Sequence, residues 1–117
     1  MSVEIVEGAY KQFVIILSLE SEQRFDLTGF DLFTVCLPGK TAEIEITEVA
    51  NANGSVVALN GSADKGEVLV TLYADDSLLL GIGRDQNIHF QIGITGTPEQ
   101  SRRFVLSKML TVIDYDC

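Results

Sequence analysis

Hydrophobic and polar residues alternate along most of the chain, and long segments with helical spacing are missing. In AEIEITEV, for example, Ile44 and Ile46 share one face while Glu43 and Glu45 share the other. Such alternation is typical of β-strands with one buried face, because successive side chains point to opposite sides. The pattern predicts about seven short strands joined by turns, which favours an antiparallel β-sandwich. The expected strands are residues 12–20, 30–37, 42–49, 56–59, 67–73, 87–95 and 102–114.

One segment, ADDSLLLGIG at residues 74–83, departs from this alternation. We expect Asp75 or Asp76 to cap one short helical turn near residues 75–80, which ends at Gly81. The chain has 117 residues and no linker-like segment, so it suits a single domain. The prediction is an all-β, immunoglobulin-like sandwich over residues 1–117, with at most this one helical turn.

Three segments carry apolar side chains on both faces: residues 13–17, 30–37 and 105–113. A strand of this kind needs cover on its second face, either from a loop of the same chain or from another subunit. We therefore expect a homo-oligomer, with cover from within the chain as the open alternative. The candidate contact residues are Phe33, Val35 and Leu37, together with Val105, Met109 and Ile113.

The charge balance restricts the classes of partner. The formal net charge is −9, and Arg102-Arg103 is the only adjacent basic pair. A nucleic-acid partner is not expected, since a phosphate backbone requires clustered Lys and Arg. The first residues, MSVEIVEG, carry glutamates where a signal peptide would be positive, and the longest apolar run, residues 13–17, is too short to cross a bilayer. No membrane partner is predicted.

The two cysteines leave two readings open. Cys36 lies inside an expected strand, and Cys117 is the last residue of the sequence. A disulfide between them is one possibility. We expect instead that Cys36 is a buried thiol and Cys117 a free thiol, because the default setting of synthesis is intracellular and reducing.

The stretch Asp26-Leu27-Thr28-Gly29 resembles the catalytic turn of an aspartic protease. That chemistry requires an aspartate followed directly by Thr-Gly or Ser-Gly, so that two carboxylates share one proton. Here Leu27 separates Asp26 from Thr28, which directs the carboxylate elsewhere. We expect a structural turn in which Asp26 accepts backbone N–H groups and Leu27 lies in the core.

Other chemistry is weakly supported by the residues. His89 is the only histidine, and no serine or aspartate pattern accompanies it as in a hydrolase. One histidine and two separated cysteines make a transition-metal site improbable. No catalytic, cofactor-binding or metal-binding residue is predicted. A calcium site at the loop ends is the remaining alternative, with Asp75, Asp76, Asp85, Asp114 and Asp116 as the available carboxylates.

The order of four motifs resembles a family of phage proteins. These motifs are the Asp26–Gly29 turn, the strand EVLVTLY, the segment DDSLLLGIG and the closing strand RRFVLSKMLTVI. Together they are similar to the β-sandwich modules of tailed-bacteriophage virions, such as the N-terminal domain of the baseplate upper protein. Two features differ: the penultimate strand is IHFQIGI where tyrosines are usual, and Ser107-Lys108 stands near the usual glycine of the last strand.

The resemblance implies a structural role without catalysis. It implies assembly with further copies and with other virion proteins, in a neck, connector, baseplate or fibre-associated component. The virion would then be the location of the protein, after synthesis in the host cytoplasm. The alternative is a monomeric module that binds a carbohydrate or calcium through its loop ends.

Overall fold

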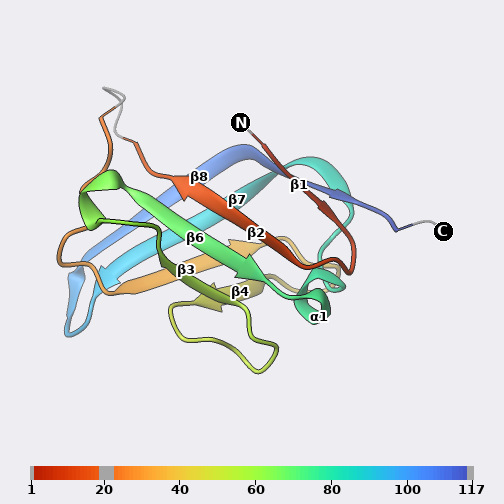
Figure 1. The fold of residues 1–117 in the computed structure, drawn as a ribbon, viewed down its shortest axis with the longest axis horizontal. Helices are drawn as coiled ribbons and strands as arrows, with labels where there is room; N and C mark the ends of the chain where they lie inside the picture. Colours follow the sequence, from red (N-terminus) through yellow and green to blue (C-terminus); the bar gives the residue numbers. More distant parts are fainter. Residues whose placement is uncertain (1, 19–22, 116–117) are drawn as a thin grey trace.

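The computed structural model describes residues 2–18 and 23–115, whose strands form two facing layers (Figure 1). Eight strands and two short helical segments occur within these residues. Their bounds are β1 Val3–Val6, β2 Lys11–Ile16, β3 Leu32–Leu37, β4 Ile44–Thr47, β5 Val56–Leu59, η1 Ala63–Lys65, β6 Glu67–Leu72, α1 Ala74–Ser77, β7 Gly83–Ile94 and β8 Thr97–Ile113.

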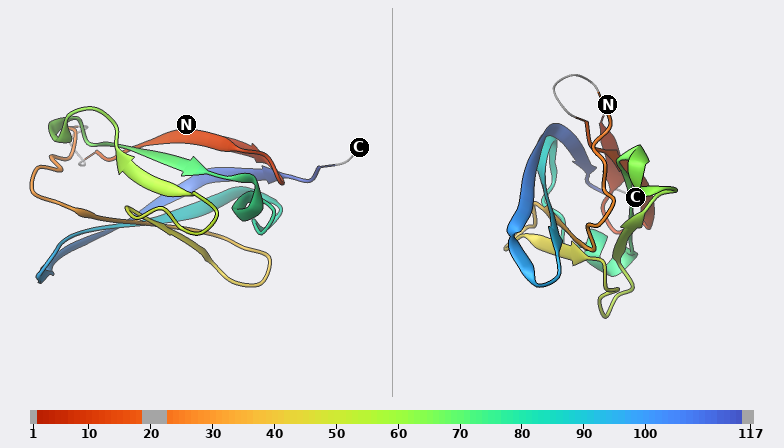
Figure 2. Two further views of the ribbon diagram at one scale, coloured as in Figure 1. Left: turned by 60° about the horizontal axis from the view of Figure 1, so that its bottom comes forward. Right: turned by 90° about the vertical axis from the view of Figure 1, so that its left-hand side faces the viewer.

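The strand order is that of an immunoglobulin-like sandwich. One sheet has the order β1-β8-β7-β3-β4, and the other has the order β2-β6-β5 (Figure 2). β1 runs parallel to β8, and every other pairing is antiparallel. β2, β5 and β6 form the smaller sheet, and β4 extends the larger sheet beyond β3, as the additional strand of variable-type immunoglobulin domains does. The predicted fold class is confirmed.

The core lies between the sheets and comes from the alternating positions of the strands. β3 buries every second residue between positions 33 and 37, and β7 does so between positions 88 and 92. Phe33 and Phe90 stack with their ring centroids 6.5 Å apart. Each fully buried apolar side chain contributes about 1.5–3 kcal/mol to stability, so this shared cluster holds the sheets together.

Two strands, β1 and β8, differ from the prediction. β1 is an additional strand, which buries Val3 and Ile5 against the core. β8 begins at Thr97, inside a segment predicted as a turn, because the chain reverses tightly at Thr95-Gly96 and polar residues then continue the hairpin. This hairpin projects from the end of the sandwich opposite α1 (Figures 1 and 2).

The helical segments also depart from expectation. α1 lies where one turn was predicted, but its N-cap is Tyr73, which makes no side-chain capping bond. The prediction that Asp75 or Asp76 caps it is therefore wrong. A second helical turn, η1, occurs in the loop before β6. Among the described residues, no helix is long and apolar enough to cross a membrane.

Candidate functional site

Three of the predicted contact residues lie in the core. Phe33, Val35 and Leu37 point from β3 toward the opposite sheet and are buried. They are unavailable to a partner, so the prediction is corrected at these positions. The opposite face of β3 carries Leu32, which is exposed, and the half-buried Cys36. The alternation of the strand was read correctly, but the face that meets the other sheet was not.

The other three predicted contact residues lie on β8. Val105 is 57% exposed on the outer face of the five-stranded sheet, and Ile113 is exposed near the end of the strand. Met109 is half-buried and packs against the core. Val105 and Ile113 are therefore accessible, but they lie far apart along β8.

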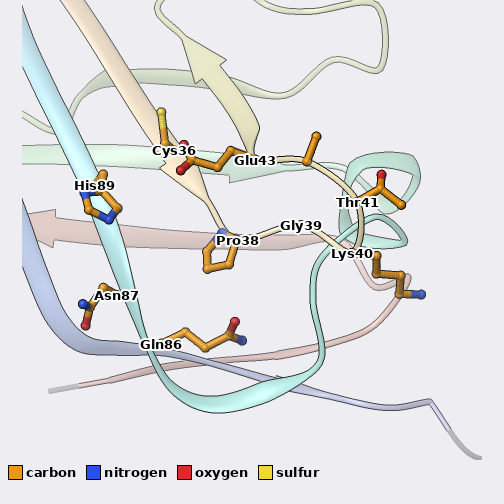
Figure 3. A pocket seen from close by; sticks show the side chains of 10 residues that line it. Cys36, Pro38, Gly39, Lys40, Thr41, Glu43, Gln86, Asn87 and His89 are labelled. Carbon is orange, nitrogen blue, oxygen red and sulfur yellow. The ribbon is translucent and has the colours of Figure 1, made fainter.

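The outer face of the five-stranded sheet carries mostly polar side chains around two adjoining hollows. Cys36 on β3 pairs across the sheet with His89 on β7, which in turn pairs with Val105 on β8. A hollow of about 460 Å³ lies beside the loop at residues 38–43 (Figure 3). A second hollow of about 290 Å³ adjoins it, and both are lined by Cys36, Glu43 and His89.

The chemistry of this face does not resemble a nucleophilic site. Burial raises the pKa of the Cys36 thiol, and the carboxylates of Glu43 and Glu45 raise it further. The neutral thiol is a weak nucleophile, so proximity to His89 does not activate it. Within residues 2–18 and 23–115, no group of three or more His, Cys, Asp and Glu side chains is arranged to hold a metal ion. Cys117, the other cysteine, lies outside the described residues.

The calcium alternative depended on carboxylates that converge at the loop ends. Asp75 is exposed within α1, whereas the next residue, Asp76, is buried and hydrogen-bonded. Asp85 sits at a left-handed position in β7, with φ 53°. Asp116 lies outside the described residues.

The Asp26–Gly29 segment forms a local turn. The backbone N–H of Thr28 donates to Asp26 Oδ1 over 2.9 Å. Hydrogen bonds from the side chain and the backbone of Thr28 lower the pKa of the exposed Asp26 carboxyl. Gly29 has φ 90°, a conformation that favours glycine. Leu27 is completely buried, and its N–H donates to the carbonyl of Ala63 over 2.9 Å. The predicted burial of Leu27 is confirmed.

A buried polar cluster around Asp76 was not predicted. Asp76, only 5% exposed, accepts side-chain bonds from Asn51 and Asn53, each of 2.9 Å, and from the hydroxyl of Ser55. Ser55 Oγ also accepts the N–H of Tyr73 over 3.0 Å. The cluster fastens the β4–β5 loop to α1. Its only sequence signal was the polar turn NANGS, which revealed nothing about a distant carboxylate.

Burial and hydrogen bonding act in opposite directions on Asp76. Burial disfavours the charged carboxylate and by itself raises the pKa. The bonds from Ser55, Asn51 and Asn53 outweigh this effect, so the pKa of Asp76 lies below its ordinary value. Asp76 is therefore an ionised structural anchor, because all three side chains donate to it.

The exposed apolar side chains are concentrated at one end of the sandwich. α1, the end of β1 and the end of β8 meet there, on the right in Figure 1. A hollow of about 330 Å³ at this end is lined by Val6, Leu78 and Tyr115, among others. We call the eight exposed large apolar residues at this end the apolar end: Val6, Tyr10, Tyr73, Leu78, Leu79, Ile82, Ile113 and Tyr115.

The chain was compared with known proteins. No family model matches it, and no curated protein matches its sequence. Among solved structures, it is similar to the extracellular domain of the voltage-gated sodium channel beta4 subunit, with 11% identity and a TM-score of 0.44 over 99% of this chain and 92% of that one. That domain forms parallel homodimers that explain its role in cell–cell adhesion. At this TM-score, the two chains share no more than the broad arrangement of their strands.

Proposed function

We propose that this chain is a non-enzymatic structural protein of a tailed-phage virion, part of a neck, connector, baseplate or fibre-associated component. It acts through protein–protein contacts, both with further copies of itself and with other virion proteins. Two lines of support lead to this proposal: the motif order described above, and the distribution of apolar surface on the sandwich.

The observation that carries the proposal is the apolar end. Among residues 2–18 and 23–115, eight of the twelve exposed large hydrophobic residues belong to it. Tyr10 and Tyr73 contact each other edge to face there, with ring centroids 5.1 Å apart. Exposed apolar side chains gathered at one end of a molecule are costly in water and are typical of surfaces that other proteins cover. Such a surface is expected in a protein that assembles with others, and is not expected in a protein that stays monomeric.

The backbone of β8 supports the resemblance at a position where the sequence departed from it. Lys108 has φ 55°, in the left-handed region that favours glycine. It lies between Leu106 and Leu110, where the pairing of β8 with β7 shifts register. The phage modules carry a glycine near this place in their closing strand. The left-handed backbone conformation that favours glycine therefore occurs here, although the residue is a lysine.

Two matched variants test whether the apolar end makes the contacts. Leu79 at the apolar end is 54% exposed, and Val105 on the outer face of the five-stranded sheet is 57% exposed. We expect Leu79→Asp to reduce incorporation into virions at least tenfold, measured by quantitative mass spectrometry of purified particles. Val105→Asp is expected to incorporate normally. The opposite result would place the contact on β8, and absence of the wild-type chain from virions would refute the proposed function.

The polar hollow beside residues 38–43 favours a second candidate, a ligand-binding module. Glu43 and Gln86 line this hollow with a carboxylate and an amide, as in a carbohydrate site, whereas the Lys40 ammonium pairs with Glu7. A rise in melting temperature with added glycans, removed by Gln86→Ala, would support this function. A rise with calcium would instead support the calcium alternative.

A further inference from the structure

β2 is an edge strand whose outer side has no strand partner among the described residues. It is hydrogen-bonded to β6 on one side only, in the three-stranded sheet β2-β6-β5. An unpaired edge presents a row of backbone N–H and C=O groups, which is a template for another strand. The question is which groups of β2 face outward and what pairs with them.

The register of β2 identifies the outward groups. The N–H of Leu17 donates to the carbonyl of Gly66 over 2.8 Å, at the end of the β2–β6 pairing. Backbone groups in an antiparallel strand face its partner at every second residue. Phe13 and Ile15 therefore face β6. The N–H and C=O groups of the three residues between and beside them face the open side: Gln12, Val14 and Ile16.

A side-chain bond agrees with this assignment. Gln12 lies opposite Thr71 on β6, and its Nε2 donates to Thr71 Oγ1 over 3.1 Å. Side chains approach most closely at the pairs that do not exchange backbone hydrogen bonds. The backbone of Gln12 therefore points away from β6, as the register requires.

The charge pattern separates β2 from the other sheet edges. No charged residue occurs between Gln12 and Ser18. β1 carries Glu4 and β4 carries Glu45, each exposed on an edge strand of the larger sheet. β5, the other edge of the smaller sheet, has four residues. Charges and short length are the usual protections of an edge; β2 carries one charge, Lys11 at its first residue, and none from Gln12 to Ile16.

We propose that β2 pairs antiparallel with β2 of a second copy, about a two-fold axis at Val14. This pairing deepens the proposed function, since it rests on assembly through protein contacts and names one contact. Val14 then faces Val14 of the second copy, and Gln12 faces Ile16 of the second copy. Each of these pairs exchanges backbone hydrogen bonds, and the two three-stranded sheets become continuous.

Two arguments favour a second copy as the occupant. The outward groups at Gln12, Val14 and Ile16 are evenly spaced about Val14, so one strand complements itself after a two-fold rotation. Two copies with a net charge of −9 each repel each other, and opposed like charges on paired strands add to this repulsion. Copies should therefore pair along an edge that carries no glutamate. β2 is a six-residue edge on which two copies meet without opposed glutamates.

The side chains next to the proposed axis are apolar. Val14 and Ile16 are half-buried on the outer face of the three-stranded sheet, and Val14 lies opposite Leu69 of β6. Pairing brings the two Val14 side chains together across the new junction. Apolar cross-strand pairs contribute about 0.2–1 kcal/mol each, in addition to the backbone bonds.

Val14→Pro tests the pairing with little effect on the fold. Proline removes an N–H that the sheet β2-β6-β5 does not use, and edge strands tolerate this change. Wild type is expected to sediment with the mass of two chains at high micromolar concentration, and Val14→Pro with the mass of one. Val14→Lys, which adds a charge at the axis, is the second variant in case proline prevents folding. Leu69→Lys on the central strand is the matched control and stays dimeric.

Hydrogen exchange measured by NMR reads the register directly. The amides of Phe13 and Ile15 are expected to be protected at every concentration. Those of Gln12, Val14 and Ile16 gain protection, at least tenfold, as the dimer forms. A dimer that persists in both Val14 variants overturns this pairing but leaves the proposed function intact. A wild-type chain that stays monomeric also overturns the pairing. This holds even if another virion protein protects the amides of Gln12, Val14 and Ile16. The proposed function is tested separately, by incorporation into virions.

Discussion

Asp26 and Asp76 both accept hydrogen bonds at turns, yet the structure uses them differently. Asp26 is exposed and accepts a bond from Thr28, two residues away. Asp76 is buried and accepts bonds from residues 21 to 25 positions away. Asp26 belongs to a motif that resembles a catalytic turn, whereas Asp76 belongs to no such motif. Structural importance here follows burial and separation in sequence.

The difference has a physical cause. A donor or acceptor at the surface exchanges one partner for water when its bond is broken, so the net loss is small. In the interior no water replaces the partner, and each unpaired group costs about 1–3 kcal/mol. In the Asp26 turn, the buried side chain that stabilises the fold is that of Leu27, the apolar neighbour of Asp26. In the Asp76 cluster, the buried group that stabilises the fold is the carboxylate of Asp76 itself.

The largest expected effect is that of Leu27→Asp. This change places a carboxylate at a completely buried position with no designed partner. We expect a loss of about 4 kcal/mol or more, enough to unfold much of the protein at room temperature. Leu27→Ala, which only leaves a cavity, loses about 2–5 kcal/mol. Thermal unfolding followed by circular dichroism measures both, and an unchanged melting temperature for Leu27→Asp would contradict this account of the turn.

Next in size is Asp76→Asn. The amide group replaces an acceptor with a donor, and it faces the donors of Asn51, Asn53 and Ser55. We expect a loss of about 2–3 kcal/mol in the free energy of unfolding, measured by urea denaturation. Asp75→Asn, at the exposed neighbouring position, is the control and changes stability by less than about 0.5 kcal/mol. Equal effects at the two positions would show that the cluster is not a structural anchor.

The pH dependence of this difference is expected to be smaller. Because folding lowers the pKa of Asp76, its ionised form stabilises the folded state. That contribution is complete above the ordinary carboxyl pKa of about 4 and decreases as the pH falls through the lowered pKa. The stability gap between wild type and Asp76→Asn should therefore narrow on acidification. A gap that widens instead would mean that folding raises this pKa.

The smallest expected effect is that of Asp26→Asn. The side-chain oxygen of asparagine still accepts the Thr28 N–H, and the site is exposed. The free energy of unfolding should change by less than about 0.5 kcal/mol, measured by the same urea denaturation. A loss as large as that of Asp76→Asn would remove the distinction between the two regions.

The strand elements were predictable because their pattern is local. Alternation in residues 42–49 and 87–95 identified β4 and β7, since side chains of a strand point to opposite faces. The projecting part of β8 near Thr97 was missed because neither of its faces is apolar. η1 was missed because its residues, Ala63–Lys65, read as an ordinary polar turn.

The fold class, the burial of Leu27 and the apolar character of both faces of residues 13–17 follow from the sequence pattern alone. These depend on periodicity and on the hydrophobic effect, which act along a short segment. Two features become visible only in the folded chain: Phe33, Val35 and Leu37 face the opposite sheet, and Asp76 meets Asn51, Asn53 and Ser55. Which face is buried depends on what lies across from it, and hydrogen-bond partners distant in sequence meet only when the chain has folded.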